Sequence, residues 1–320
     1  MNGLLDFGIQ FLQGILLLVL APGLLGLLRY LRTSMQGRRR PITNLLQPYR
    51  DLIRLARQPA VRAQTGSWLF RLAPPVLLAA YGTLAFAMPA FGRPPLLRVD
   101  LITVIYLLGL ARFTFSLAGL DAGAPFGGLG GSREMFLHFQ TEIGLAVMLV
   151  ALVLDWNTLD LQAMVLKHAA LGPGLLLRPD LLLLAAALAV LILFETGRIP
   201  IDNPATHLEL TMGHKAIALE YAGRDLALIE WAEAIKLTAL LTLFTGLFLP
   251  FSMRSIFQFP VGVSGGLDFL VKLVICIITV ALWETTRPKL RLRKVVGLSL
   301  LAATLGLIAV LYIVVVHPGS

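Results

Sequence analysis

The side chains best suited to chemistry lie between Glu195 and Arg224, in a polar stretch flanked on both sides by long apolar runs. Ionisable residues at or near membrane depth are costly, so they usually mark a functional pathway. No other polar stretch of the sequence mixes acidic and basic residues so densely. Its ionisable residues are Glu195, Arg198, Asp202, His207, Glu209, His214, Lys215, Glu220 and Arg224.

This pattern favours a relay of protons or of an electrostatic signal. Burial raises the pKa of a carboxyl group by up to several units, so the group can exchange protons near neutral pH. The charges of Arg198, Lys215 and Arg224 oppose that rise, and the alternative is a set of structural ion pairs that holds the loop together. The candidate proton-coupling residues are Glu142, Glu195, Asp202, Glu209, Glu220, Glu230 and Glu233.

The sequence gives little support to metal or redox chemistry. The single cysteine, Cys276, lies in an apolar run and cannot by itself hold an iron–sulfur cluster or a cysteine-rich zinc site. The five histidines form no HExxH pattern, and the phosphate-binding pattern GxxxxGK[ST] is absent. We therefore expect no cofactor and no metal ion in this chain.

The composition places these residues in a membrane protein. Of the 320 residues, 57% are hydrophobic and 14% charged, and the mean hydropathy is +0.82. A soluble domain has about 25% charged residues. The net charge of +9 could suggest nucleic acid, but the basic residues fall in short loops between apolar runs, as membrane topology requires.

Eight apolar segments are long enough, or nearly so, to cross a bilayer, for which about 20 residues are needed. We therefore expect an all-α polytopic membrane protein, with residues 1–320 forming a single integral-membrane domain. The first segment runs on to Leu31 without a basic start, so we interpret it as a span and not as a leader. The segments are 4–31, 67–90, 98–120, 133–154, 180–196, 225–249, 263–284 and 292–316.

The basic residues predict the orientation. Of the 27 lysines and arginines, 18 lie in loops that follow odd-numbered spans and five in loops that follow even-numbered spans. The positive-inside rule then places the odd loops in the cytoplasm and both termini outside. We expect a multi-pass protein of a bacterial or archaeal cytoplasmic (inner) membrane.

The fifth span is short. All fourteen residues from Leu181 to Phe194 are apolar, and they reach only about 21 Å, whereas the hydrocarbon core is about 30 Å thick. A crossing helix must therefore carry Glu195 to membrane depth. Arg198, one turn further on, could pair with Glu195, just as Lys236 could pair with Glu233 in the next span.

The charged cytoplasmic loop, residues 195–224, is expected to contain a helix. Asn203-Pro204 is a typical helix start, Thr206 and Glu209 form a competing start with capping-box spacing, and Gly223 is a plausible stop. On one continuous helix, Glu209 and Glu220 would share a face.

Two further cytoplasmic segments have recognisable patterns. In the basic loop 29–66, residues Ile42 to Gln58 form an amphipathic pattern that suits a helix lying in the membrane interface. This helix is either a simple lipid anchor or a docking platform for a soluble partner. The glycines between Gly123 and Gly131 favour tight turns and close approach to a neighbouring segment.

The chain resembles the complex I subunit 1 family, and most closely its branch in membrane-bound group 4 nickel–iron hydrogenases, which includes formate hydrogenlyase subunit 4 and hydrogenase-4 component C. Three motifs carry the resemblance: MQGRRRPITNLLQPYRDLIRL from Met35, GGSREM from Gly130, and ETGRIPIDNPATHLELTMGH from Glu195 followed by LEYAGR. Two positions depart from the pattern. Lys215 replaces the usual acid after His214, and Arg40 replaces a glycine.

The resemblance implies a membrane-anchoring and energy-coupling subunit of a hydrogenase complex. Its cytoplasmic loops would dock the hydrogenase large subunit and the small iron–sulfur subunit, which would carry the nickel–iron centre and the clusters. Its buried carboxylates would connect to antiporter-like membrane subunits. The residues implied in docking are Gln36, Arg38, Arg39, Gln47, Pro48, Tyr49, Asp51, Arg133, Arg198, His207, His214 and Arg224.

Other functions remain open at this point. In complex I relatives the same loops form a quinone chamber, although the hydrogenase-type motif here leads us to expect no functional quinone site. A passive scaffold would only anchor soluble subunits. A stand-alone transporter is disfavoured because no two halves of the sequence show matching interrupted hydrophobic segments.

Overall fold

The computed structural model describes residues 2–37, 41–62, 66–90, 95–199, 201, 213–249, 261–287 and 292–316. These residues are mainly helical, and an isolated bridge between Asp100 and Asp160 is the only β-structure among them. The all-α prediction is therefore confirmed. The long helices are α1 (Asn2–Met35), α3 (Trp68–Ala87), α4 (Leu101–Asp121), α5 (Pro125–Trp156), α7 (Pro179–Glu195), α10 (Gly223–Phe248), α12 (Val261–Thr286) and α13 (Leu292–Val316).

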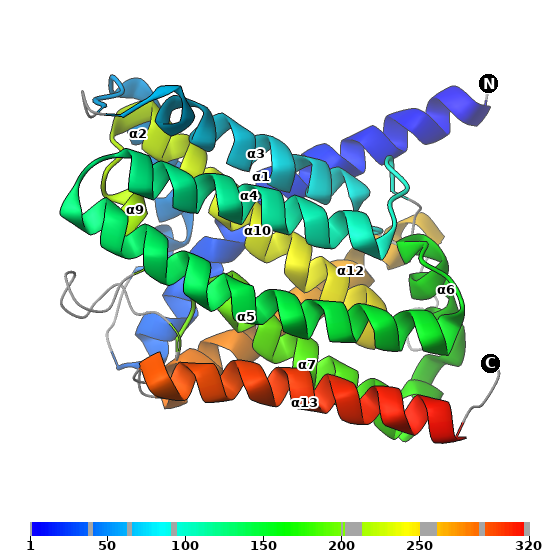
Figure 1. The fold of residues 1–320 in the computed structure, drawn as a ribbon. Coiled ribbons are helices and arrows are strands. Elements are labelled where there is room, and N and C mark those ends of the chain that lie inside the picture. The colour runs from blue at the N-terminus through cyan, green and yellow to red at the C-terminus, as the bar shows by residue number, and fades with distance from the viewer. Residues whose placement is uncertain are drawn as a thin grey trace.

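Each of the eight predicted spans coincides with one long helix, and successive long helices run in opposite directions along the bundle (Figure 1). Within the described ranges, six are long and apolar enough to cross a membrane: α1, α3, α4, α5, α12 and α13. The protein is thus a multi-pass membrane protein. As the sequence predicts, α7 is short, with 17 residues. The other remaining helix, α10, carries several charged residues in its first half.

The two ends of the bundle differ. The first turn of α1, the last turn of α13 and the short helix α6 (Leu161–Leu171) lie at one end, and α2 (Gln47–Arg57) and α9 (His214–Ala218) lie at the other (Figure 1). The even number of long helices thus brings the first and last helix ends to the same side. Which side faces the cytoplasm stays a prediction.

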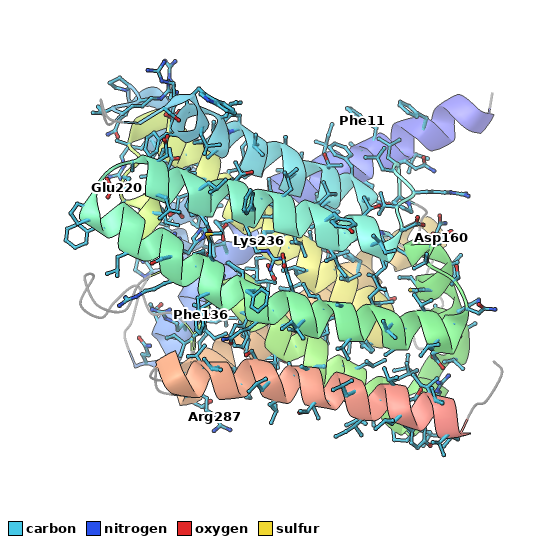
Figure 2. The ribbon with its side chains drawn as sticks, viewed as in Figure 1. Phe11, Phe136, Asp160, Glu220, Lys236 and Arg287 are labelled. Carbon is cyan, nitrogen blue, oxygen red and sulfur yellow. The ribbon has the colours of Figure 1, made fainter. Side chains whose placement is uncertain are left out.

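Helix α10 is the centre of the bundle. It packs against α1, α2, α3, α6, α7 and α12, and nearly all of its residues from Ala232 onward are buried. Because α10 also carries Glu230, Glu233 and Lys236, the packing of the fold brings charged side chains into the interior (Figure 2).

Prolines in α1 and α3 create attachment points for the segment that contains α10. Proline has no backbone N–H, so the carbonyl four residues earlier loses its helical donor. Pro22 frees the carbonyl of Leu18 in this way, and the Trp231 indole N–H donates to that oxygen at 3.1 Å. In α3, Pro74 frees the carbonyl of Phe70, which accepts a 3.0 Å hydrogen bond from the hydroxyl of Tyr221.

The amphipathic segment predicted from Ile42 to Gln58 forms a 3-10 turn, η1 (Ile42–Leu46), followed by α2. Glycines on α1 let it approach closely, since a Cβ at Gly26 would lie 2.1 Å from the Leu45 carbonyl oxygen. Some apolar side chains of this segment face the bundle, and others face away from it. Pro48 is buried, whereas Leu46 and Ile53 are more than half exposed.

Two expectations about helix boundaries were wrong. The glycine-rich segment before Arg133 is the first part of α5, which starts at Pro125 because proline fits the first helical turn. Three of its glycines do allow close approach, as expected: Gly127 and Gly131 lie against α4, and Gly130 lies against α9.

The second error concerns the charged loop. Helix α9 ends at Ala218, so Glu220 lies in a turn and not on a continuous helix. Gly223, with φ of 58°, begins α10 instead of ending a helix, and a Cβ there would lie 2.1 Å from the carbonyl oxygen of Pro59. The predicted helix start at 203–209 lies outside the described residues.

Candidate functional site

Arg112 is the centre of a buried group of ionisable side chains. It lies on α4 and is 5% exposed. Its Nη1 donates to Glu195 Oε1 on α7 at 2.6 Å, and its Nη2 reaches Glu142 Oε1 on α5 at 3.4 Å. A charge-assisted hydrogen bond of this kind is strong, and burial keeps water from weakening it. Arg112 therefore ties three helices together.

Two residues of α5, His138 and Glu134, extend this group of ionisable side chains from Arg112. Arg112 Nη1 lies 3.4 Å from His138 Nδ1, and His138 Nε2 lies 2.7 Å from Glu134 Oε1. A guanidinium can only donate, so His138 accepts at Nδ1 and donates at Nε2. His138 thus lies between a cation and a carboxylate.

His214, the first residue of α9, connects α5 to α10. Its Nδ1 lies 3.0 Å from Glu134 Oε1, and its Nε2 lies 3.2 Å from Glu233 Oε1. Burial lowers the pKa of His214, but the negative charges of Glu233 and Glu134 outweigh this effect and raise it to about 9. His214 is therefore an imidazolium at neutral pH.

The group ends at a lysine in the middle of α10. Lys236 Nζ lies 3.0 Å from Glu233 Oε2, which confirms the predicted pairing of these two residues. Lys236 is 1% exposed. We refer to the whole connected set as the polar chain; in order it comprises Glu142, Arg112 with Glu195, His138, Glu134, His214, Glu233 and Lys236.

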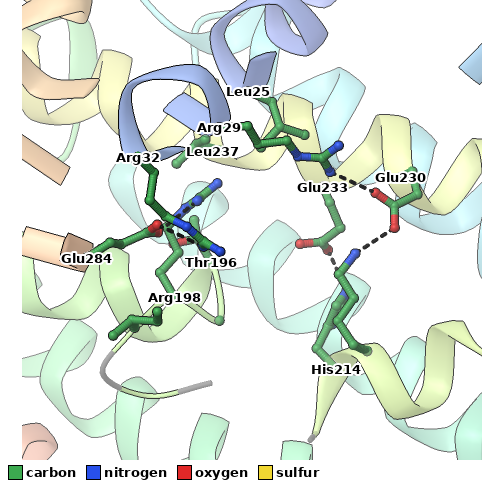
Figure 3. Close-up of a pocket in the computed structure, with 13 residues that line it drawn as sticks. Leu25, Arg29, Arg32, Thr196, Arg198, His214, Glu230, Glu233, Leu237 and Glu284 are labelled. Carbon is green, nitrogen blue, oxygen red and sulfur yellow. Dashed lines mark hydrogen bonds and ion pairs between the residues drawn. The ribbon is translucent and has the colours of Figure 1, made fainter. Parts of the chain in front are cut away.

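A cavity of about 140 Å³ adjoins the polar chain at His214 and Glu233. On one side Glu284 of α12 pairs with Arg198 at 2.9 Å and with Arg32 at 3.4 Å. Figure 3 shows Glu284 beside Arg32 on that side, and Glu230, Glu233 and His214 facing them across the cavity.

The opposite wall of this cavity belongs to α9 and α10. Glu230 Oε1 accepts from Lys215 Nζ at 2.6 Å, and its Oε2 lies 3.8 Å from Arg29. Lys215, which stands where the family pattern has an acid, thus pairs with Glu230 in the cavity wall. Ion pairs on both walls make the cavity hydrophilic.

The other end of the polar chain reaches the outer face of α4 and α5. The side chain of Glu142 is 52% exposed. It lines a second cavity of about 150 Å³ together with Arg112 and His138, and the exposed rings of Phe113 and Phe139 stand at the same cavity. The polar chain therefore extends from an internal cavity to a mainly apolar outer face.

The predicted coupling residues separate into three groups. Glu142, Glu195 and Glu233 belong to the polar chain, and Glu230 lines the cavity. Glu220 lies apart and accepts a hydrogen bond from the Gly127 N–H at 3.1 Å. Asp202 and Glu209 lie outside the described residues.

The expected pairing of Glu195 with Arg198 was wrong. Glu195 ends α7 with its side chain inside the bundle, where Arg112 holds it. Arg198 lies beyond the turn at Gly197, which has a φ of 55°, and pairs with Glu284. The helix ends before the spacing of one turn can bring the two side chains together.

The predicted docking residues are spread over the end of the bundle that carries α2 and α9. Of these, Arg198 and His214 take part in the interior contacts described above. Gln36, Gln47 and Arg224 are exposed, Tyr49, Asp51 and Arg133 are half-buried, and Pro48 is buried. Arg38, Arg39 and His207 lie outside the described residues.

Several residues of the site were not predicted. Glu134 and His138 share a four-residue spacing with Glu142, which places all three on one face of a helix and could have revealed them. Arg112 is a lone arginine inside an apolar span, which is itself a signal of function. Among the described residues, no cluster of three or more His, Cys, Asp or Glu side chains has an arrangement that could hold a metal ion.

Comparisons with known proteins agree with this architecture. The chain is 32% identical to formate hydrogenlyase subunit 4 of Escherichia coli (strain K12) over 88% of its own length and 90% of that protein. It is 35% identical to hydrogenase-4 component C of the same organism, with 86% and 85% covered. NADH-quinone oxidoreductase subunit 8 of Rhodothermus marinus is 26% identical over 67% of this chain and 65% of that protein.

A solved structure shares the fold. A chain in the structure of the membrane-bound sulfane sulfur reductase, an archaeal respiratory membrane complex, superposes with a TM-score of 0.77 over 94% of this chain and 99% of the other, at 18% sequence identity. The family model described as NADH dehydrogenase matches residues 8–317. The chain therefore belongs to the NADH dehydrogenase family of complex I subunit 1-like membrane proteins.

Proposed function

We propose that this chain is the membrane-anchoring and proton-coupling subunit of a membrane-bound nickel–iron hydrogenase complex of the formate hydrogenlyase type. The observation that carries the proposal is the polar chain itself. It joins a hydrophilic cavity at one end of the bundle to the outer face of α4 and α5. Ionisable groups kept inside a membrane bundle typically serve ion or proton movement.

The chemistry of the polar chain suits a relay. Carboxylates alternate with imidazoles from Glu134 to Glu233, and both kinds of group can accept and release a proton. A proton added at Glu233, or released by His214 into the cavity, would change the charge of that residue, and the change would act on each neighbour in turn. The chain holds no redox centre in this proposal, so partner subunits supply the nickel–iron site and the iron–sulfur clusters.

The two ends of the polar chain would meet different partners. The soluble subunits would dock at the end with α2 and α9, where most of the predicted docking residues lie. An antiporter-like membrane subunit would cover the α4–α5 face, because a half-exposed carboxylate such as Glu142 is costly against lipid. The names of the two E. coli relatives support the hydrogenase branch.

Substitution of Glu134 tests the proposal. Glu134→Gln keeps the size of the side chain but removes its charge and its ability to titrate, and we expect proton translocation per hydrogen evolved to be largely lost. The measurement is hydrogen evolution and proton uptake in inverted membrane vesicles. Glu220→Gln is the matched control, since Glu220 lies outside the polar chain. Normal coupling in Glu134→Gln would exclude the proposal.

A quinone-chamber subunit is the second candidate. A cavity of about 250 Å³ lies between α1, α2 and α10, with apolar side chains such as Leu52 and Leu226 and polar ones such as Arg29 and Glu230 in its wall. Such a mixture could hold a headgroup and part of a tail. Inhibition of the purified complex by quinone analogues would favour this candidate over a role in a hydrogenase.

A further inference from the structure

Lys236 occupies a costly position that the proposed relay does not need. Its side chain is among the largest fully buried ones of the described residues, and within that part of the chain its ammonium has one close ionic partner, Glu233, at 3.0 Å. Removing an ammonium group from water costs several kcal/mol unless opposite charges compensate. A second carboxylate nearby would stabilise the buried ammonium further.

Glu195 supplies such a negative charge. One of its carboxylate oxygens accepts from Arg112, but the other, Oε2, is buried without a hydrogen-bond partner among the described residues. The charge of Glu195 acts on Lys236, as does that of Glu134. Lys236 thus forms the inner end of the polar chain, where it pairs with Glu233 and is stabilised by the charge of Glu195.

Tyr81 of α3 fills the space beside Lys236. Its ring lies 5.3 Å from the ammonium, in a cation–π arrangement, and the side chain is 1% exposed. The charges that act on Tyr81 come from both ends of the polar chain, namely Lys236, Glu233, Glu195 and Arg112. The aromatic ring keeps the region dry, so these charges interact in a low dielectric.

The buried part of the polar chain pairs carboxylates with cations. His214 is one of the cations, as an imidazolium. Three carboxylates therefore face three cations. The carboxylates are Glu134, Glu195 and Glu233, and the cations are Arg112, His214 and Lys236.

We propose that Lys236 is a positioning residue that fixes Glu233 at the inner end of the polar chain and supplies the positive charge that keeps the interior carboxylates from repelling one another. The inference rests on the proposed function and extends it. With Lys236 paired to Glu233, a proton taken up at Glu233 leaves an uncompensated ammonium in the interior, which favours release of a proton elsewhere in the polar chain. Without the lysine charge, Glu233 and Glu195 would face an excess of negative charge, and one of them would keep a proton permanently.

The test compares Lys236→Met with Lys236→Arg in the membrane complex, purified through a tag on this chain and reconstituted in liposomes. Reduced methyl viologen serves as electron donor. We expect Lys236→Met to abolish most of the proton uptake per hydrogen evolved, while hydrogen evolution in the presence of an uncoupler persists. Lys236→Arg should restore most of the coupling. Lys272→Met, which breaks another lysine–carboxylate pair on α12, is the matched control and should behave as the wild type.

An infrared spectrum gives a second readout that does not depend on turnover. Lys236→Met should add the carbonyl band of a protonated carboxyl group, which Lys236→Arg should not add. If Lys236→Met fails to assemble, Lys236→Gln, which keeps a polar side chain but removes the charge, takes its place: lost coupling with the added carboxyl band supports the inference, and wild-type coupling without that band overturns it.

The outcomes separate the inference from the proposed function. Normal coupling and an unchanged spectrum in Lys236→Met, together with lost coupling in Glu134→Gln, would overturn the role of Lys236 and leave the relay intact. Normal coupling in both variants would overturn the proposed function itself.

Discussion

At the scale of single residues, the buried ion pair between Arg112 and Glu195 is the feature with the largest consequences. Both side chains are almost inaccessible to water, and Nη1 and Oε1 are 2.6 Å apart. The attraction within such a pair only roughly offsets the loss of hydration, but removal of one partner leaves an isolated charge in the interior. Arg112 and Glu195 should therefore depend on each other.

We predict that Arg112→Met destabilises the protein by about 3–5 kcal/mol, the usual cost of breaking a buried pair, and that the double variant Arg112→Met/Glu195→Met recovers most of the loss. Thermal unfolding of the purified protein in detergent measures both effects. A double variant no more stable than Arg112→Met would show that the pair is not the source of the loss.

His214 gives the protein a predicted dependence on pH. Its pKa is raised to about 9 in the folded state, against about 6.5 for an unperturbed histidine. The resulting stabilisation, on the order of 3 kcal/mol, is fully present below pH 6.5 and is lost as the pH rises through about 9. We expect the unfolding temperature to fall across this window.

His214→Asn provides the control for that pH dependence, because asparagine can still donate a hydrogen bond to Glu134 but does not titrate. The fall in unfolding temperature between neutral pH and pH 9 should be absent or much smaller in this variant. An equal fall in both proteins would assign the pH dependence to other groups.

At the scale of elements, the prolines of α1 and α3 decide how the segment from Tyr221 to Trp231 is attached. Pro22 and Pro74 each open one carbonyl group, and each of these two carbonyl groups receives one aromatic donor. In the membrane interior an unsatisfied carbonyl is costly, so each pairing fixes both a helix and its neighbour.

We predict that Trp231→Phe costs about 1–3 kcal/mol, because it leaves the Leu18 carbonyl without a donor. In a Pro22→Ala background residue 22 regains its N–H, which can bond to Leu18, so the same substitution should cost clearly less. A double-mutant cycle on thermal stability measures the difference. Trp68→Phe is the matched control, since Trp68 is 70% exposed. Equal costs in both backgrounds would contradict the proposed role of the proline.

At the scale of the whole molecule, the alternation of the long helices and the distribution of basic residues lead to one topology. We predict both termini outside the cytoplasm and α2 inside. Alkaline phosphatase fused after Ser320 should be active, and a green fluorescent protein fused at the same position should be dark. The opposite pair of results would reverse the orientation of the bundle.

The sequence was sufficient to predict the architecture because that information is local. Apolar runs of bilayer length predicted all eight long helices, and even the shortness of α7 was visible from Leu181 to Phe194. The start of α5 was misplaced because the glycines before Arg133 resemble a loop. They are helical because α4 and α9 pack directly against them, which is a tertiary effect.

The site was only partly predictable, because its pairings join residues far apart in the chain. Arg112 and Glu195 are separated by 83 positions, and Arg198 and Glu284 by 86. Spacing along one helix predicted the pair Glu233–Lys236 correctly, but it assigned Glu195 to Arg198. No local pattern could show that Glu195 turns inward to α4 while Arg198 turns toward α12.

The proline-opened carbonyls also have a consequence for biogenesis. Leu18 and Phe70 are synthesised early, whereas their donors Trp231 and Tyr221 are synthesised much later. Until then, the nascent protein lies in the bilayer with two carbonyl groups that lack hydrogen-bond donors. A ribosome product cut after position 212 should be cleared by membrane proteases faster than one cut after position 249, as pulse-chase labelling would reveal. The maturing protein would thus be exposed to quality control until its sixth long helix is inserted.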